Sequence, residues 1–240
     1  MAIRVTVWNE YRHELRKPEV AALYPEGIHG AVKGILDGEE FEVTTATLDS
    51  PEFGLPDELL ERTDVLVWWG HTAHKEVPDE LAEKIRQRVY AGMGFVALHS
   101  AHHSKPFKVT VGTTGNLSWG RNQKGIVWNL APTHPIAQGI PPHFEIFEEM
   151  YGEPFCIPKP DDLIFATWYE DGNLFRGGAT FVRGAGKVFY FHPGHETCES
   201  FYNPFVRTII RNGVRWCAPA RLAEGFNLGG CYQQHEPVIS

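Results

Sequence analysis

The sequence predicts an α/β fold in which a mostly parallel sheet is joined by crossover helices. In the first hundred residues, short apolar runs alternate with segments of helical character, and this order favours parallel strands. The run 94–98 is almost entirely apolar, which is typical of a strand buried on both faces. No low-complexity linker or internal repeat divides the sequence, so we expect residues 1–240 to form a single domain.

The first half of the chain supplies the expected parallel strands. A strand at 3–8 is followed by a long Pro- and Gly-bearing loop and a helix at 28–37, and further strands are expected at 40–47, 64–69 and 94–98. A helix from Pro78 to Tyr90 is indicated by apolar residues at four-residue spacing, namely Val77, Leu81, Ile85 and Val89. Proline at its start and Gly92 after its end are the usual helix boundaries.

In the second half of the chain, consecutive strands replace the alternation of strands and helices. Pro- and Gly-rich turns separate five expected strands, at 125–130, 143–149, 162–169, 174–182 and 187–191. Residues 183–186 (Arg-Gly-Ala-Gly) indicate a hairpin turn between the last two. A final helix is expected at about 203–217, and 218–240 is interpreted as a partly irregular tail.

Charge and composition exclude several classes of partner. The formal net charge is −8, which argues against nucleic acid or an anionic membrane as a ligand. The densest basic stretch, Lys84 to Arg88, is typical of the solvent face of a helix. No apolar run approaches the roughly 18 residues of a membrane span, and the N-terminus begins as a strand rather than a signal peptide.

Four cysteines are scattered along the chain without a Cys-x-x-Cys pair, at Cys156, Cys198, Cys217 and Cys231. This usage favours a reduced, cytoplasmic protein, and a disulfide between two of them remains the alternative.

Histidines follow three of the expected strands. His71 comes after 64–69, His99 after 94–98, and His192 and His195 after 187–191. Ligands of open α/β sheets bind outside the carboxyl ends of the strands, so these imidazoles are predicted to meet at one edge. A metal site or general acid–base chemistry is the functional interpretation.

The segment around His99 is typical of a strand-to-helix elbow, because small residues flank the exposed position. His102 lies one helical turn later, and an i, i+3 pair of histidines can share one cation. The alternative is that His99 only packs or caps the helix start. His71 and His74 have the same spacing after their own strand, where the alternative is a polar surface loop.

Carboxylates complete the predicted chemistry. Glu196 follows His195 and is expected to orient it or act as a base. Gly194 allows a close approach of the chain to a ligand, which favours His195 over His192. Glu10, after the first strand, is the preferred single carboxylate, whereas Glu14 is expected to be exposed to solvent.

Two further groups of residues are candidates. His29, at a helix start, is a possible fourth metal ligand beside His71, His99 and His102. Aromatic, carboxylate and guanidinium groups in the second half suit a polyhydroxylated ligand, and the residues are Trp119, Arg121, Glu149 and Tyr151. The alternative is that the aromatic residues belong to the core.

Seven short motifs, taken together and in this order, resemble the ThuA family of trehalose-utilization proteins. They extend from Trp8 to Glu196, within a match that reaches Trp216, and are Trp8-Asn9-Glu10, Arg12-His13-Glu14, Gly27-Ile28-His29-Gly30, Trp69-Gly70-His71, Leu98-His99-Ser100-Ala101-His102, His134-Pro135-Ile136 and Pro193-Gly194-His195-Glu196. The resemblance implies a flavodoxin-like fold similar to class I glutamine amidotransferases, with helices on both faces of the sheet.

The resemblance also places His99 where amidotransferases carry their nucleophilic cysteine. Without a thiolate there is no covalent intermediate, so glutaminase activity is not expected. Relatives often carry another residue at His192, which again favours His195 and Glu196. The family's place in disaccharide metabolism implies a carbohydrate ligand or its oxidised keto derivative.

The leading hypothesis is therefore an enzyme that acts on a disaccharide or keto sugar at a site holding a divalent metal, with zinc preferred. Glu10, or His195 with Glu196, would move protons. The alternative is a non-catalytic sugar-binding or regulatory protein on a relic amidotransferase fold. Aromatic residues in the second half suit a homo-oligomer.

Overall fold

The computed structural model describes residues 2–220. Nine strands in this part of the chain form one sheet, in the order β2-β1-β3-β4-β9-β8-β7-β5-β6. Their bounds are β1 Ile3–Asn9, β2 Phe41–Thr47, β3 Val65–Trp69, β4 Gly94–Leu98, β5 Ser118–Asn129, β6 His143–Gly152, β7 Asp162–Tyr169, β8 Leu174–Arg183 and β9 Gly186–Phe191.

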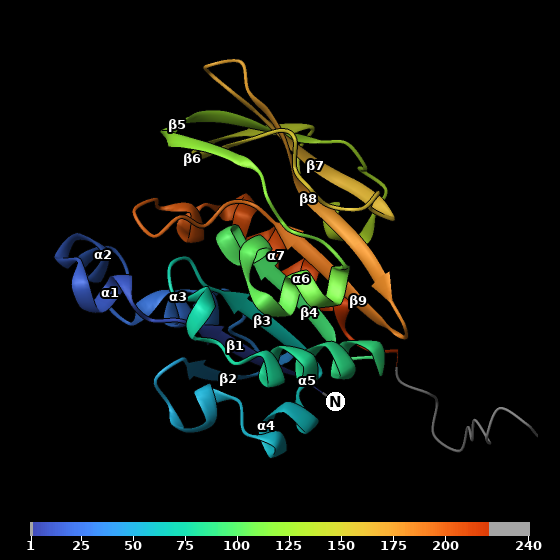
Figure 1. Cartoon of the computed structure of the whole chain (residues 1–240). Coiled ribbons are helices and arrows are strands. Elements are labelled where there is room, and N and C mark those ends of the chain that lie inside the picture. Colours follow the sequence, from blue (N-terminus) through green and yellow to red (C-terminus); the bar gives the residue numbers. More distant parts are fainter. Residues whose placement is uncertain (1, 221–240) are drawn as a thin grey trace, which may run out of the picture.

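The sheet has a parallel part and an antiparallel part. Strands β2, β1, β3, β4 and β9 are parallel to one another, as the alternation of the first half predicts. From β9 outward, β8, β7, β5 and β6 pair antiparallel and form the upper part of Figure 1. The tight turn between β8 and β9 pairs Arg183 with Gly186, which confirms the predicted hairpin. The α/β fold class with a parallel core is confirmed.

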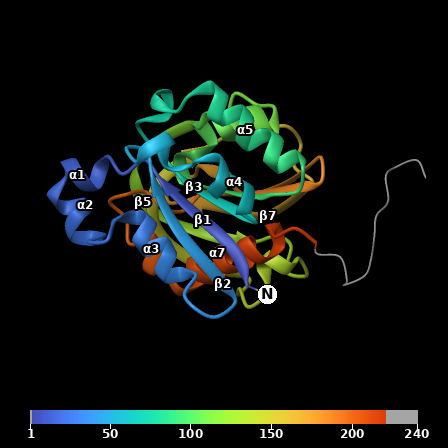
Figure 2. The same ribbon diagram turned by 90° about the horizontal axis from the view of Figure 1, so that it is seen from below.

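Helices cover both faces of the parallel part, and Figure 2 shows α5 and α7 on opposite sides of the strands. The helices are α1 His13–Arg16, α2 Pro18–Leu23, α3 Gly27–Ile35, α4 Asp57–Arg62, α5 Asp79–Tyr90, α6 Lys105–Val111 and α7 Pro204–Cys217. Successive side chains of β3 point to opposite faces of the sheet. Val65 and Val67 pack with α3 and α7 on one face, whereas Leu66 packs with α4, α5 and α6 on the other. The core is thus two apolar layers with the sheet between them.

Several local expectations differ from the structure. The loop predicted after the first strand contains the short helices α1 and α2, the second of which starts at Pro18 because proline suits the first helical turn. Strand β5 begins at Ser118, seven residues before the predicted start, and helices α4 and α6 were not expected. The polar residues of early β5 hid its strand character, since they lie on an exposed stretch of the sheet.

None of the helices in residues 2–220 is long and apolar enough to cross a membrane. Cys156, Cys198 and Cys217 are free thiols. Cys231 and most of the predicted tail lie outside the described residues.

Candidate functional site

His99 stands at a sharp elbow between β4 and a short 3-10 turn, His99–His103. Its φ is +52°, in the left-handed region that costs a non-glycine residue roughly 1–2 kcal/mol. The imidazole is fully buried. A histidine held in a strained conformation at the carboxyl edge of the sheet agrees with the elbow that the small flanking residues predict.

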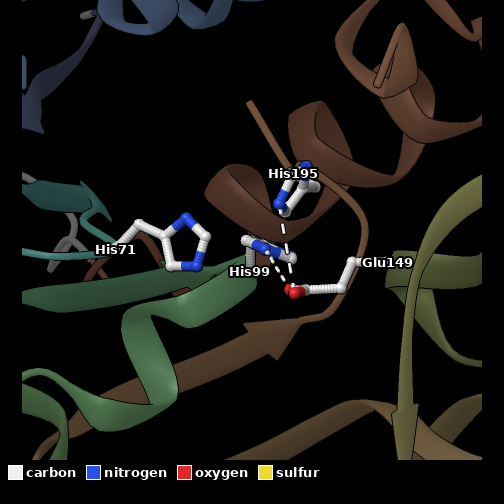
Figure 3. A group of neighbouring side chains, drawn as sticks. All are labelled: His71, His99, Glu149 and His195. Carbon is white, nitrogen blue, oxygen red and sulfur yellow. Dashed lines mark ion pairs between the residues drawn. The ribbon is translucent and has the colours of Figure 1, made fainter. Parts of the chain in front are cut away.

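Four side chains from separate segments converge beside this elbow, as Figure 3 shows. One potential ligand atom from each lies within 4.8 Å of the others, and the four residues are His71, His99, Glu149 and His195. They come from the loop after β3, the elbow after β4, strand β6 and the loop after β9. The sequence predicts that His71, His99 and His195 meet at one sheet edge; Glu149 joins them from the antiparallel part.

The contact between His99 and Glu149 joins two atoms that both carry lone pairs. The Nδ1–H of His99 donates to the carbonyl oxygen of His192 at 3.0 Å, which leaves a lone pair on Nε2, 3.3 Å from the Tyr151 hydroxyl. That Nε2 lies 3.2 Å from Glu149 Oε2. Glu149 Oε2 is buried and accepts no hydrogen bond among the described residues. Burial lowers the pKa of His99 to about 3 and raises the pKa of Glu149.

Glu196 is a buried carboxylate that fixes the orientation of His71. Its Oε2 accepts from His71 Nδ1 at 2.8 Å, while Oε1 accepts from Lys17 Nζ at 2.9 Å and contacts His13 Nδ1 at 3.2 Å. Burial opposes ionisation, but the hydrogen bond from His71 and the nearby imidazoles hold the pKa of Glu196 far below its usual range. Burial likewise disfavours the cationic form of His71, yet the hydrogen bond to Glu196 raises its pKa above the usual value. Because Nδ1 of His71 is the donor, Nε2 is the nitrogen left for a ligand.

His195 has the opposite tautomer. The backbone N–H of Thr197 donates to His195 Nδ1 at 3.2 Å, so the ring proton of the neutral imidazole sits on Nε2. Nε2 lies 3.3 Å from Glu196 Oε2 and 4.0 Å from Glu149 Oε1. Burial lowers the pKa of His195 to about 4, so the ring is neutral at pH 7. His195 therefore presents an N–H to the cluster, whereas Nε2 carries a lone pair in His99 and in the neutral form of His71.

Two further buried carboxylates hold the loops that carry these side chains. Glu10 accepts from the backbone N–H groups of His71, Thr72 and Ala73 at 2.8 to 3.1 Å. Both oxygens of Glu10 accept hydrogen bonds in this way, so Glu10 fixes the conformation of the loop that carries His71 and does not face the cluster. Glu148 accepts hydrogen bonds from the loop after β9 in the same manner.

Glu148 was not singled out from the sequence. It is fully buried and accepts from the N–H groups of Gly194 and His195 at 2.6 and 3.0 Å, and from Ser200 Oγ at 2.6 Å. Burial raises its pKa to about 7. Its only sequence signal is two consecutive glutamates in an otherwise alternating strand, where one must point inward.

A pocket of about 430 Å³ opens beside the cluster. Tyr151, which stacks on His99 with ring centroids 5.1 Å apart, forms part of its wall, and its hydroxyl lies 2.8 Å from Ser100 Oγ and 3.3 Å from His99 Nε2. Trp119 is 70% exposed among the lining residues. The full lining is His71, His74, Ser100, His102, His103, Asn116, Leu117, Trp119, Glu149 and Tyr151.

The remaining candidates lie apart from the cluster. His102 lines the pocket, but its Nδ1–H donates to Gly115 O at 2.6 Å, and it is not among the converging atoms. His29, in the first turn of α3, accepts from Asn9 Nδ2 at 3.0 Å. Arg121 is exposed and lines none of the described pockets. The expected gathering of His29 and His102 around one ion with His71 and His99 therefore differs from the structure.

Glu14 is also corrected: it is buried, because its Oε1 accepts from Asn9 Nδ2 and from the N–H of Ile28. His192 is buried below the cluster, where Nε2 donates to Glu149 O at 3.0 Å. Cys198 and Cys217 are buried, and burial raises the pKa of both thiols, so neither supplies a thiolate.

A family model described as "ThuA: Trehalose utilisation" matches residues 4–217, nearly the whole described chain. The chain belongs to the ThuA family. The histidine cluster thus lies within the matched region. A search of curated proteins found no match.

Solved structures similar to this ThuA chain share its fold. A putative ThuA-like protein from Parabacteroides merdae superposes with a TM-score of 0.69 at 16% identity, covering 94% of this chain and 95% of the other. A second from Bacteroides uniformis gives 0.66 at 16% identity, with coverage of 90% and 91%. A cytoplasmic protein from Salmonella typhimurium gives 0.56 at 13% identity, with coverage of 90% and 99%.

Proposed function

We propose that this ThuA-family chain binds a divalent cation through His71 Nε2, His99 Nε2 and Glu149, and acts on an uncharged carbohydrate or its keto derivative in the adjoining pocket. The observation that carries the proposal is the 3.2 Å contact between His99 Nε2 and the unpartnered, buried Oε2 of Glu149. Two lone pairs at this distance repel each other unless a cation or a proton lies between them.

The distance favours a cation. Ligand atoms about 2.0–2.1 Å from a tetrahedral ion lie roughly 3.3 Å from each other, close to the separation seen here. Two imidazoles and one carboxylate are a donor set that suits zinc and leaves a coordination position open, as catalytic sites require. The hydrogen bond from His71 to Glu196 is the carboxylate–histidine arrangement that commonly orients a metal ligand.

The other residues of the site have separable roles. A bound cation would polarise a carbonyl oxygen or lower the pKa of a water molecule. His195, neutral at pH 7, donates its Nε2–H to negative charge that develops on the substrate. Tyr151, linked to Ser100, donates or accepts a proton at the pocket wall beside His99.

The pocket supports a carbohydrate as ligand. Its lining combines imidazoles, an amide and hydroxyls with the exposed ring of Trp119, a surface on which a sugar ring can stack. None of the described lining residues is Lys or Arg, the groups that recognise a phosphate. This lining favours an unphosphorylated sugar, in keeping with the family description of trehalose utilisation.

The test is cation-dependent turnover. Chelator-treated protein, with and without added zinc, is incubated with a panel of disaccharides and their keto derivatives, and the sugar signals are followed by NMR. We expect consumption only with the cation, loss of turnover in Glu149→Gln, and a raised KM in Trp119→Ala. Saturable binding that Trp119→Ala weakens, with no consumption of any sugar, would instead identify a non-catalytic sugar-binding protein.

A cytoplasmic location is part of the proposal, supported by the free thiols of Cys156, Cys198 and Cys217.

A further inference from the structure

The antiparallel part of the sheet has an apolar face that no described helix covers. We call it the outer face, and it consists of Phe147 on β6, Lys124, Ile126 and Trp128 on β5, Trp168 on β7, Leu174 on β8, and Glu145 on β6. Phe147 is 57% exposed, Trp168 54% and Leu174 53%. Large aromatic residues on three adjacent strands make a contiguous patch, which monomeric proteins rarely present to water.

The opposite face of the same strands is covered. Val127, Phe144 and Ile146 belong to the core, and Phe144 packs on Phe205 of α7 with ring centroids 5.2 Å apart. In Figure 1 the helices lie below these strands, not above them. Each strand therefore carries apolar residues on both faces, although only one face has a partner in residues 2–220. Half-solvated antiparallel strands ordinarily place polar residues on the outside.

The register makes the outer face continuous. Ile126 is paired with Trp168, which is paired in turn with Leu174, so one apolar row crosses three strands. Glu145 is paired with Ile126 and extends this row onto β6, while Phe147 and Lys124 are paired in the neighbouring row. Two pockets border this region, and Lys124 and Glu145 line both of them.

Lys124 on β5 and Glu145 on β6 are diagonal neighbours in the outer face, and both line the two pockets there. Among the described residues, neither forms an ion pair. A surface with one positive and one negative charge beside an apolar row can pair with a second copy of itself. If two copies stack face to face about a two-fold axis that lies in the interface, midway between Lys124 and Glu145, then Lys124 of each copy lies opposite Glu145 of the other.

We propose that the outer face is the interface of a homodimer, with a second copy of this chain as its occupant. The exposed rings of Phe147 and Trp168 are the buried anchors, and two symmetry-related Lys124–Glu145 pairs fix the register of the copies. A flat sheet with exposed tryptophans also suits a polysaccharide. The unpaired charges favour the second copy, because a neutral sugar chain offers them no counter-charge.

The test is the mass in solution of the full chain by light scattering coupled to size exclusion, and by sedimentation velocity at several concentrations. We expect a dimer for the wild type. Trp168→Ser should weaken dimerisation by about 30-fold, the loss typical of a central aromatic anchor. Leu15→Ser, which alters an exposed apolar residue on α1 away from the outer face, is the matched control and should leave the dimer intact.

A charge exchange makes the test specific. Lys124→Glu and Glu145→Lys should each weaken the dimer by about tenfold or more, because each places like charges together. The double variant Lys124→Glu/Glu145→Lys should restore dimerisation, which a general loss of folding would not do.

Three outcomes overturn the proposal: a monomeric wild type at every concentration, a dimer indifferent to Trp168→Ser, or a double variant no better than the singles. A monomer whose tryptophan fluorescence responds to soluble glucans would identify a polysaccharide platform instead. None of these variants changes a residue of the histidine cluster, so we expect the same metal content in all of them, and this test stands apart from that of the histidine site.

Discussion

Replacing Glu196 by glutamine removes the charge that organises the site while keeping the shape of the side chain. The carboxylate is 1% exposed and lies next to His71, His13, Lys17 and His195. Glutamine retains one acceptor oxygen but places an NH₂ group where a carboxylate oxygen stood. That NH₂ faces either the Lys17 ammonium or the Nδ1–H of His71, and both are donors.

The expected loss of stability follows from the exposure of these partners. Lys17 is 41% exposed and returns to water, so its pair contributes about 1 kcal/mol or less. His71 is 23% exposed and loses a charge-assisted hydrogen bond of about 1.5–3 kcal/mol. We therefore expect Glu196→Gln to reduce the free energy of unfolding by roughly 3 kcal/mol. Cation affinity should fall by about 10–100-fold, the usual effect of removing a carboxylate behind a histidine ligand.

The assay is urea unfolding of the metal-free protein at pH 7, followed by zinc titration. Glu40→Gln is the control, since Glu40 pairs with Arg215 at the surface and is 39% exposed, so its removal should cost no more than about 1 kcal/mol. A loss below 1 kcal/mol in Glu196→Gln, with unchanged zinc affinity, would refute the reasoning that this carboxylate orders the site.

Three further predictions concern the chain around the cluster. Gly194→Ala should lower the free energy of unfolding by about 1–3 kcal/mol in thermal unfolding, because the φ of Gly194 is +140° and an added Cβ would lie 2.7 Å from the Phe201 ring. The control is Gly112→Ala, whose added Cβ meets no atom within 4 Å, so the variant should lose only the stability that the strain of its φ of +80° costs. His99→Asn should be about 1 kcal/mol more stable than His99→Ala in denaturant, since asparagine tolerates a φ of +52°; equal stability would argue against strain at the elbow. Burial raises the pKa of Glu148 from 4.5 to about 7, so its contribution to the free energy of unfolding is complete below about pH 4.5. About 3 kcal/mol of that contribution is lost as the pH rises to about 7. Glu148→Gln should lack this loss, and parallel curves of unfolding free energy against pH for the variant and the wild type would contradict the prediction.

The parallel part of the fold was predictable because its signals are local. The apolar runs at 65–69 and 94–98 are five residues long, a length that favours strands buried on both faces, and helix α5 shows its periodicity directly. The start of β5 was missed because its exposed residues follow no alternation. Helices α1 and α2 were missed because they are only four and six residues long and are held by tertiary contacts.

The site was predictable to the extent that parallel strands end at one edge. That rule brings His71, His99 and His195 together without knowledge of the sheet order. The rule does not predict the position of Glu149, which lies on an antiparallel strand. It also does not show which of Glu10 and Glu149 belongs to the cluster. Only hydrogen bonds show that Glu10 is occupied by backbone N–H groups while Oε2 of Glu149 is left without a partner.

The most direct test of the central claim is the metal content of untagged protein, prepared without chelator and measured by plasma mass spectrometry. Glu149→Gln is the test variant, because it keeps the shape of the side chain, and His143→Ala is the control, since His143 is exposed and outside the cluster. Near-stoichiometric zinc in the wild type and in His143→Ala, with none in Glu149→Gln, is the predicted result. Wild-type protein that holds no metal and takes up no added zinc would contradict the cation site, and would mean that a shared proton joins His99 to Glu149.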